Sequence, residues 1–260
     1  MHTFLSCLNA ELRKNRNSMA VWLSLAGTAA NVLLFLGLHL VDGELGGGFS
    51  AGSWREYITN HYAGIAFMML PLYVIILCSL AFQMEHRQEM WVQLHTLPVA
   101  PQQVYLGKLA FLLLLFVGAH LLFILGMLLS GLLFGLIGPA NKLLEELPSL
   151  GQIAGLSART VLSILGLMGL HAWLSFRFST FIVPLLIGIL GYVVAGLLGA
   201  AWPWQFLNPY APSFLFMPRY EGEIAAGQLG WLSAAELMSL AYLGLFTALA
   251  LRALNRRRVG

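Results

Sequence analysis

The feature that most constrains this chain is a succession of long segments without charged residues. One of them, Leu109 to Ile137, runs for about 29 residues. An apolar segment of roughly 20 residues is long enough to cross a bilayer as a helix. A backbone inside lipid must satisfy its own hydrogen bonds, and strand-like alternation of apolar and polar residues is absent. The sequence therefore predicts an all-α polytopic membrane protein.

Six segments are candidate transmembrane helices. They are Val21–Val41, Tyr62–Phe82, Leu109–Ile137, Ile153–Phe176, Phe178–Ala201 and Trp231–Leu251. Only the sequence RFS separates the fourth from the fifth, where Arg177 and Pro184 indicate a tight turn. The composition agrees, since 10% of the residues are charged, against about 25% in soluble domains.

The distribution of basic residues predicts the orientation. Six spans place both termini on one side of the membrane, and ten of the 14 Lys and Arg residues flank the spans on that side. The positive-inside rule puts this side in the cytoplasm. These clusters explain the net charge of +3, with membrane lipid as their counter-surface, and no nucleic-acid partner is needed.

Two further elements are predicted outside the spans. Residues 1–20 predict a short amphipathic helix that lies in the membrane interface, with Phe4, Leu5 and Leu8 on one face. Residues 21–260 form the transmembrane domain. Within it, residues 202–230 hold many aromatics and prolines, which predicts a partly re-entrant outer insertion before the sixth span.

The connection between the second and third spans, residues 84–108, is the longest on the predicted cytoplasmic side. Periodicity predicts a helix from about Met84 to His95, which Pro98 and Pro101 break. Pro101 then starts a second helix that runs into the third span. This elbow carries apolar and aromatic side chains between charges and indicates a protein-binding surface, with a linker lying on lipid as the alternative. The candidate contact residues are Glu85, Arg87, Glu89, Trp91, Leu94, Leu97, Pro98 and Val99.

Three polar residues within the spans are candidates for a substrate path. Arg159 and Glu236 lie just inside the predicted outer ends of the fourth and sixth spans, and intramembrane charges are functional candidates. A simpler reading exists for each. Arg159 can snorkel to the headgroups, and Glu236 can form a capping box with Ser233. A pairing of Arg159 with Glu236 is a further hypothesis. His120 lies deep in the third span, where it is alternatively a hydrogen-bonded packing residue.

Motifs for catalysis or cofactor binding are missing from the sequence. There is no Walker A, no nucleophile elbow and no H-E-x-x-H, and the seven histidines lack metal-ligand spacing. We therefore predict neither an enzyme nor a cofactor or metal site in this chain. A stand-alone secondary carrier is a weaker alternative because no internal repeat is visible.

Several stretches resemble the membrane subunit of type-2 ABC exporters, the family that includes lantibiotic-immunity and peptide-export permeases. They are the acidic-then-basic AELRKNRN, Glu85, LHTLPVAP, Lys108 and the outer stretch WPWQFLNPYAPSFLFM. The resemblance implies six spans in a bacterial cytoplasmic membrane with both termini inside. It also implies that the elbow is a coupling helix seated in a groove of an ATPase.

The same resemblance implies the partners and the activity. Two such subunits, identical or paralogous, form a path, and two separate ABC ATPase subunits hold ATP and Mg²⁺. The few embedded charges favour export of an amphiphile, such as a hydrophobic peptide or a lipid. A non-transporting anchor or signalling subunit of an ABC-type ATPase complex would share the fold and is the alternative.

Overall fold

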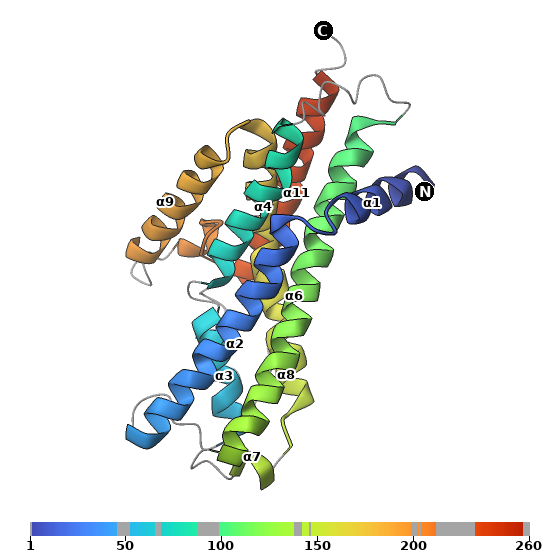
Figure 1. Cartoon of the computed structure of the whole chain (residues 1–260). Coiled ribbons are helices and arrows are strands. Elements are labelled where there is room, and N and C mark those ends of the chain that lie inside the picture. The colour runs from blue at the N-terminus through green and yellow to red at the C-terminus, as the bar shows by residue number, and fades with distance from the viewer. Residues whose placement is uncertain are drawn as a thin grey trace.

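The computed structural model describes residues 2–45, 53–65, 69–87, 99–137, 142–145, 147–198, 202, 204–211 and 232–256. Most of its helices run along one direction and form an elongated bundle, which α1 (His2–Lys14) crosses at a steep angle (Figure 1). No strand occurs within these described ranges. The prediction of an all-α protein is confirmed for this part of the chain.

Among the described residues, four helices are long and apolar enough to cross a membrane. They are α2 (Met19–Leu45), α6 (Pro101–Ile137), α8 (Leu150–Arg177) and α11 (Ala234–Arg256). Two shorter apolar helices, α4 (Leu70–Arg87) and α9 (Ile182–Leu198), occupy the places of the second and fifth predicted spans. Four of the six predicted spans are thus supported by helix length and composition, and the crossing of α4 and α9 stays a prediction.

The second predicted span, Tyr62–Phe82, overlaps two described helices. On its amino-terminal side lies the end of α3 (Trp54–Gly64), and α4 begins at Leu70. Ile65 and Met69 are π-helical, and residues 66–68 lie outside the described residues, so continuity of this span stays a prediction. Pro71 lies in the first turn of α4, where a proline, which lacks an N–H, is tolerated.

The third predicted span belongs to a single helix of 37 residues, α6. At 1.5 Å per residue it is about 56 Å long, which exceeds the bilayer core. Its start at Pro101 confirms the predicted helix that runs from the elbow into the span. Gly131 and Gly135 let other elements approach its far end. A Cβ on them would lie 2.5 Å from Trp54 of α3 and 3.1 Å from Leu144 of α7 (Lys142–Glu145).

Helices α8 and α11 pack closely through glycines on α8. A Cβ on Gly166 would lie 2.8 Å from the Cα of Ser239, and one on Gly169 would lie 2.9 Å from the Cα of Leu243. The predicted turn between the fourth and fifth spans is present, since α8 ends at Arg177 and α9 starts at Ile182. The fifth helix therefore begins four residues later than predicted.

The chain after α9 turns back along that helix. It forms a short 3₁₀ helix, η4 (Gln205–Leu207), and then brings Tyr210 beside Gly191, where a Cβ would lie 2.4 Å from the tyrosine ring. The Tyr210 hydroxyl lies 3.4 Å from the carbonyl oxygen of Ile187 and 3.2 Å from Nε2 of His171. The prediction of a re-entrant outer insertion over residues 202–230 stays a prediction, because most of that range lies outside the described residues.

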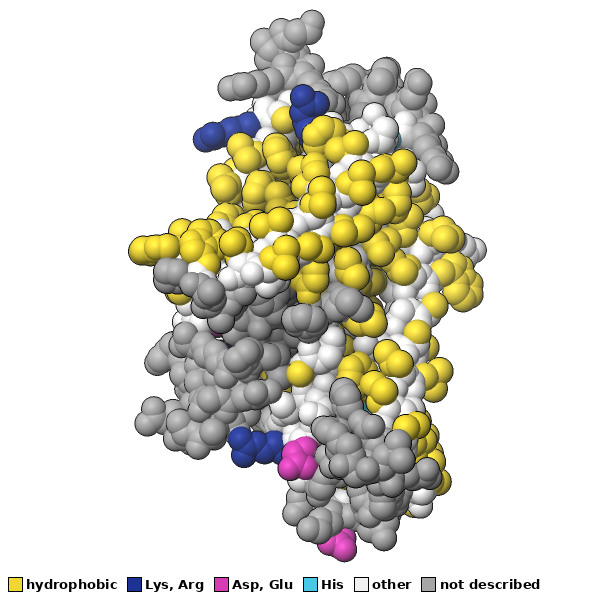
Figure 2. Space-filling model, turned by 90° about the vertical axis from the view of Figure 1, so that its left-hand side faces the viewer, with side chains coloured by type: hydrophobic (Ala, Val, Ile, Leu, Met, Phe, Trp, Pro, Cys, Tyr) yellow, Lys and Arg dark blue, Asp and Glu magenta, His cyan; other side chains and the backbone are white. Residues whose placement is uncertain are grey.

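The outer surface of the bundle is apolar. Exposed leucines, isoleucines and valines cover α6 and α9, and Figure 2 shows hydrophobic side chains in a broad band between charged groups at the two ends. Leu5 and Leu12 on α1 are also exposed. We call the end that carries α1 and the last turn of α11 the terminal end, and the end that carries α7 the distal end (Figure 1).

Candidate functional site

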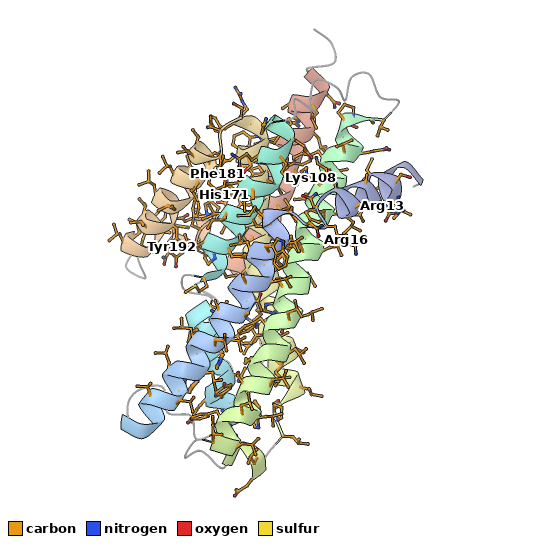
Figure 3. The ribbon with its side chains drawn as sticks, viewed as in Figure 1. Arg13, Arg16, Lys108, His171, Phe181 and Tyr192 are labelled. Atoms are coloured by element: carbon orange, nitrogen blue, oxygen red, sulfur yellow. The ribbon has the colours of Figure 1, made fainter. Side chains whose placement is uncertain are left out.

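Four charged side chains meet where α1 contacts α4 and α6. They are Glu11 and Lys14 of α1, Glu85 of α4 and Lys108 of α6. Nζ of Lys108 lies 2.7 Å from Oε2 of Glu11 and 2.7 Å from Oε1 of Glu85. Nζ of Lys14 lies 2.8 Å from the same Glu85 oxygen. We call this group the charge cluster; it lies near the terminal end, at the level of Lys108 in Figure 3.

The neighbouring sequence allows α1 to press against α6 at this point. A Cβ on Gly107 would lie 3.1 Å from Cβ of Cys7 and 3.3 Å from the backbone nitrogen of Leu8. A larger residue at position 107 would push α1 away from the helix that carries Lys108. The glycine and the lysine therefore act together, since one permits the close approach and the other supplies the charge.

The charge cluster is electrically balanced, and three of its four side chains are buried, whereas that of Lys14 is 21% exposed. The side chain of Lys108 is 0% exposed, and those of Glu85 and Glu11 are nearly as buried. Two lysines and two glutamates carry no net charge together. Lys108 also donates to the carbonyl oxygen of Ala81 at 3.3 Å, and Asn15 donates to Oε2 of Glu11 at 3.1 Å. Such bonds offset the cost of removing charges from water.

The charge cluster connects α1 to both sides of the elbow. Glu85 lies two residues before the end of α4, and Lys108 lies in the second turn of α6. Any movement of these two helix ends relative to each other must change the cluster or carry α1 along. The arrangement is therefore able to couple the position of α1 to the geometry of the elbow.

The predicted ATPase-contact residues have different places. Glu85 is buried in the charge cluster, so a contribution to an external contact would be indirect. Arg87 is the last residue of α4, and Val99 is half-buried just before α6. The other five, Glu89, Trp91, Leu94, Leu97 and Pro98, lie outside the described residues.

Arg159 and Glu236 form an ion pair between α8 and α11. Nη1 of Arg159 lies 3.5 Å from Oε1 of Glu236, and both side chains are buried. The predicted capping box is present too. Glu236 accepts from the backbone N–H of Ser233 and donates its own N–H to the Ser233 hydroxyl at 3.4 Å. The hypothesised pairing exists, and a role for the pair in a substrate path stays a prediction.

His120 lines a cavity between α2, α4 and α6. Its Nε2 lies 3.5 Å from the hydroxyl of Tyr62, which is 2.9 Å from Oγ of Ser157. The ring stacks on Phe116 with centroids 6.2 Å apart. His120 is thus a buried, hydrogen-bonded packing residue that also borders a cavity. Its predicted place in a substrate path stays a prediction.

Sequence reasoning missed two parts of these sites. It noted Glu85, Lys108 and the charges of α1 separately, but it did not pair them. It also passed over Ser24, Thr28 and Asn31 of α2, which line the cavity beside His120. Their spacing of four and three residues places them on one helix face, so a search for polar residues at helical spacing within an apolar span would have found them.

The fold and its buried ion pairs define the class of this protein. It is a helical membrane protein that crosses the bilayer several times and holds charged residues inside the helix bundle. Residues 7–196 match the family described as ABC-2 family transporter protein, and the chain belongs to that family. No curated protein and no solved structure matches it. The chain is therefore the transmembrane component of an ABC transporter, and its family works with ABC ATPase subunits.

The family match covers most of the residues discussed above. It includes all four members of the charge cluster, the cavity-lining residues and Arg159, and it ends before Glu236. The resemblance to ABC-2 permeases is confirmed, while the narrower resemblance to lantibiotic-immunity permeases stays a prediction.

Proposed function

We propose that this chain is the transmembrane subunit of an ABC exporter that moves an amphiphile, such as a hydrophobic peptide or a lipid, out of the cytoplasm or the membrane. It pairs with a second permease subunit, identical or paralogous, in a bacterial cytoplasmic membrane with both termini inside. Separate ATPase subunits bind ATP and Mg²⁺ and supply the energy. The family match is the basis for the transporter class.

The observation that carries the coupling mechanism is the charge cluster. Its ion pairs join α1 to the last turns of α4 and the first turns of α6, the two helices that flank the elbow. An ATPase that pulls on the elbow would shift α1, α4 and α6 together as one rigid group, which is a common way of transmitting a domain movement.

The elbow supplies the test. Trp91→Ala combined with Leu97→Ala removes the two best candidate anchors from its sequence. Truncating a buried anchor costs about 2–4 kcal/mol, or roughly 30- to 1,000-fold in binding. We expect the double variant to lose the ATPase during purification in mild detergent, or to keep it while ATP hydrolysis no longer drives transport in vesicles.

A matched control is Leu147→Ala combined with Leu150→Ala, which removes two exposed leucines near the distal end. This variant should bind the ATPase and transport normally. Unchanged binding and transport in the elbow variant would show that the elbow is a linker lying on lipid. A wild-type complex that hydrolyses ATP without moving any amphiphile would instead indicate the non-transporting anchor.

A further inference from the structure

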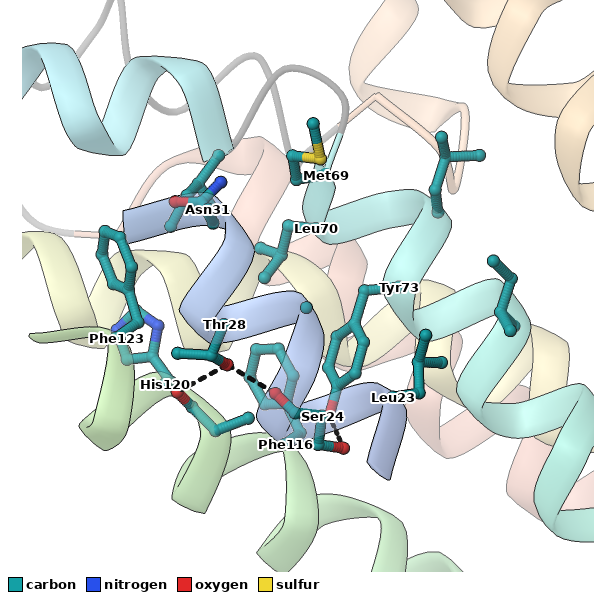
Figure 4. Close-up of a pocket in the computed structure, with 15 residues that line it drawn as sticks. Leu23, Ser24, Thr28, Asn31, Met69, Leu70, Tyr73, Phe116, His120 and Phe123 are labelled. Carbon is teal, nitrogen blue, oxygen red and sulfur yellow. Dashed lines mark hydrogen bonds between the residues drawn. The ribbon is translucent and has the colours of Figure 1, made fainter. Parts of the chain in front are cut away.

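The cavity beside His120 is large enough to hold a small ligand. Its volume is about 310 Å³, at the lower end of the range of about 300–1,000 Å³ found for ligand pockets. It extends along α2 from Leu23 to Asn31, about 12 Å at 1.5 Å per residue. Figure 4 shows α2 and the side chains of α4 and α6 around it.

The cavity reaches the surface of the bundle. Gly27 of α2 and Met69, just before α4, both line it and are both exposed. Leucines and isoleucines of α2 and α4 form much of its wall. In a membrane this opening would face hydrocarbon, so an alkyl chain could enter sideways from the bilayer.

Most polar groups in the wall already have partners. The Ser24 hydroxyl donates to the carbonyl oxygen of Ala20 at 2.7 Å and lies 2.7 Å from the Tyr73 hydroxyl. Thr28 donates to the carbonyl oxygen of Ser24 at 2.7 Å. The hydroxyl groups of Ser24, Thr28 and Tyr73 in the middle of the cavity are therefore already hydrogen-bonded within the protein.

Asn31 is different. The residue is 7% exposed, and neither its amide nitrogen nor its amide oxygen has a hydrogen-bond partner among the described residues. A buried amide without a partner is unfavourable, and lipid supplies no water to satisfy it. Because Asn31 borders open space, a ligand placed in the cavity can provide both a donor and an acceptor.

We propose that this cavity binds an amphiphile with one alkyl chain in the apolar part and an uncharged amide, ester or hydroxyl head at Asn31. No Asp, Glu, Lys or Arg is among the described residues of the wall, so the site offers no counter-charge for an ionic head. The site does not depend on the export proposal, since a resident membrane lipid and an exported cargo share this chemistry.

The structure offers a variant that fills the cavity and a matched control. A Cβ on Gly27 would have no heavy atom within 4 Å, and the same holds for Gly37, which lies on the same helix outside the cavity. Gly27→Leu therefore places a side chain in the cavity without a backbone clash. Gly37→Leu makes the same chemical change elsewhere on α2.

The probe is a single-chain fatty amide with a diazirine in its alkyl chain. It is added to the full-length protein in nanodiscs of phosphatidylethanolamine and phosphatidylglycerol, irradiated and located by peptide mapping. We expect labelling at the wall of the cavity, near Met69 and Tyr73, in the wild type and in Gly37→Leu. Gly27→Leu should lose most of it. Asn31→Leu should weaken labelling about three- to tenfold, the effect of one lost hydrogen bond.

Labelling with a diazirine-bearing monoacylglycerol, a membrane lipid with one chain and an uncharged head, separates the two sources. A monoacylglycerol that labels the same peptides indicates a resident lipid, and labelling by the fatty amide alone indicates a cargo; both support the site. Equally strong labelling by a diazirine-bearing phosphatidylethanolamine, which has two chains and a charged head, would contradict the proposed chemistry. Labelling spread over exposed residues such as Leu121 and unchanged in Gly27→Leu would overturn the proposal. So would an Asn31→Leu variant that leaves labelling intact and dissociates a dimer, because Asn31 would then bind a second subunit.

Discussion

The charge cluster and the cavity are two polar regions of one apolar bundle, and they are built in opposite ways. In the cluster, two lysines and two glutamates form ion pairs with one another at 2.7–2.8 Å. In the cavity, Asn31 has no partner and faces about 310 Å³ of space. Buried charges that pair with one another fix the positions of the helices that carry them. A buried polar side chain that has no partner and borders a cavity is instead a candidate ligand-binding group.

This contrast predicts opposite effects of removing the polar group. Deleting a member of a buried ion pair leaves its partner charged and unpaired, which destabilises the protein. Deleting a buried amide that has no partner removes an unfavourable group. Three substitutions, ordered from the largest expected effect to the smallest, test this difference.

Lys108→Met should have the largest effect. It leaves Glu11 and Glu85 buried without the lysine that binds both, and breaking a buried pair costs about 3–5 kcal/mol. The free energy of unfolding, measured by denaturant titration in detergent micelles, should fall by that amount. Adding Glu11→Gln to Lys108→Met removes the charge that is left without an ion pair, while Glu85 keeps its pair with Lys14, and should recover much of the loss. Wild-type stability of Lys108→Met alone would contradict a structural role for the cluster.

Arg159→Met should destabilise less, by about 2–3 kcal/mol, because Glu236 keeps its capping bonds to Ser233 when the arginine is gone. The double variant with Glu236→Gln should regain part of this stability in the same titration. A different result would contradict a purely structural role for this pair. If Arg159→Met lowers export or ATPase stimulation but leaves the free energy of unfolding at the wild-type value, the pair belongs to a substrate path.

Asn31→Leu should have the smallest effect and the opposite sign. In detergent without an added amphiphile, the variant should be more stable than the wild type by about 1 kcal/mol or less, since a buried amide without a partner is replaced by an apolar side chain. The difference should shrink when the fatty amide is added, because the ligand stabilises only the wild type. A loss of stability in the absence of ligand would mean that Asn31 makes bonds within the fold.

Much of the fold followed from local sequence signals. Pro101 and the long apolar segment behind it predicted the start and course of α6, and the RFS sequence with Pro184 predicted the turn before α9. These features depend on residues close together in the chain. Pro71 carries the same kind of information about the first turn of α4, and the sequence analysis did not use it.

The candidate sites were harder to predict because they join distant parts of the chain. Glu11 and Lys108 are 97 residues apart, and their contact depends on how Gly107 lets α1 approach α6. The pairing of Arg159 with Glu236 could be hypothesised because buried opposite charges need each other. The cavity could not be predicted, since empty space is a property of packing and no residue pattern encodes its volume.

Helix α6 gives these separate regions a mechanical relation. It touches α2 closely at Gly126, where a Cβ would lie 2.8 Å from Cγ2 of Val32. Along the axis, Gly126 lies about 27 Å from Lys108 and about 14 Å from Gly135. Because α6 is one continuous helix, a displacement of Lys108 would be passed along its axis to His120, about 18 Å away in the cavity wall.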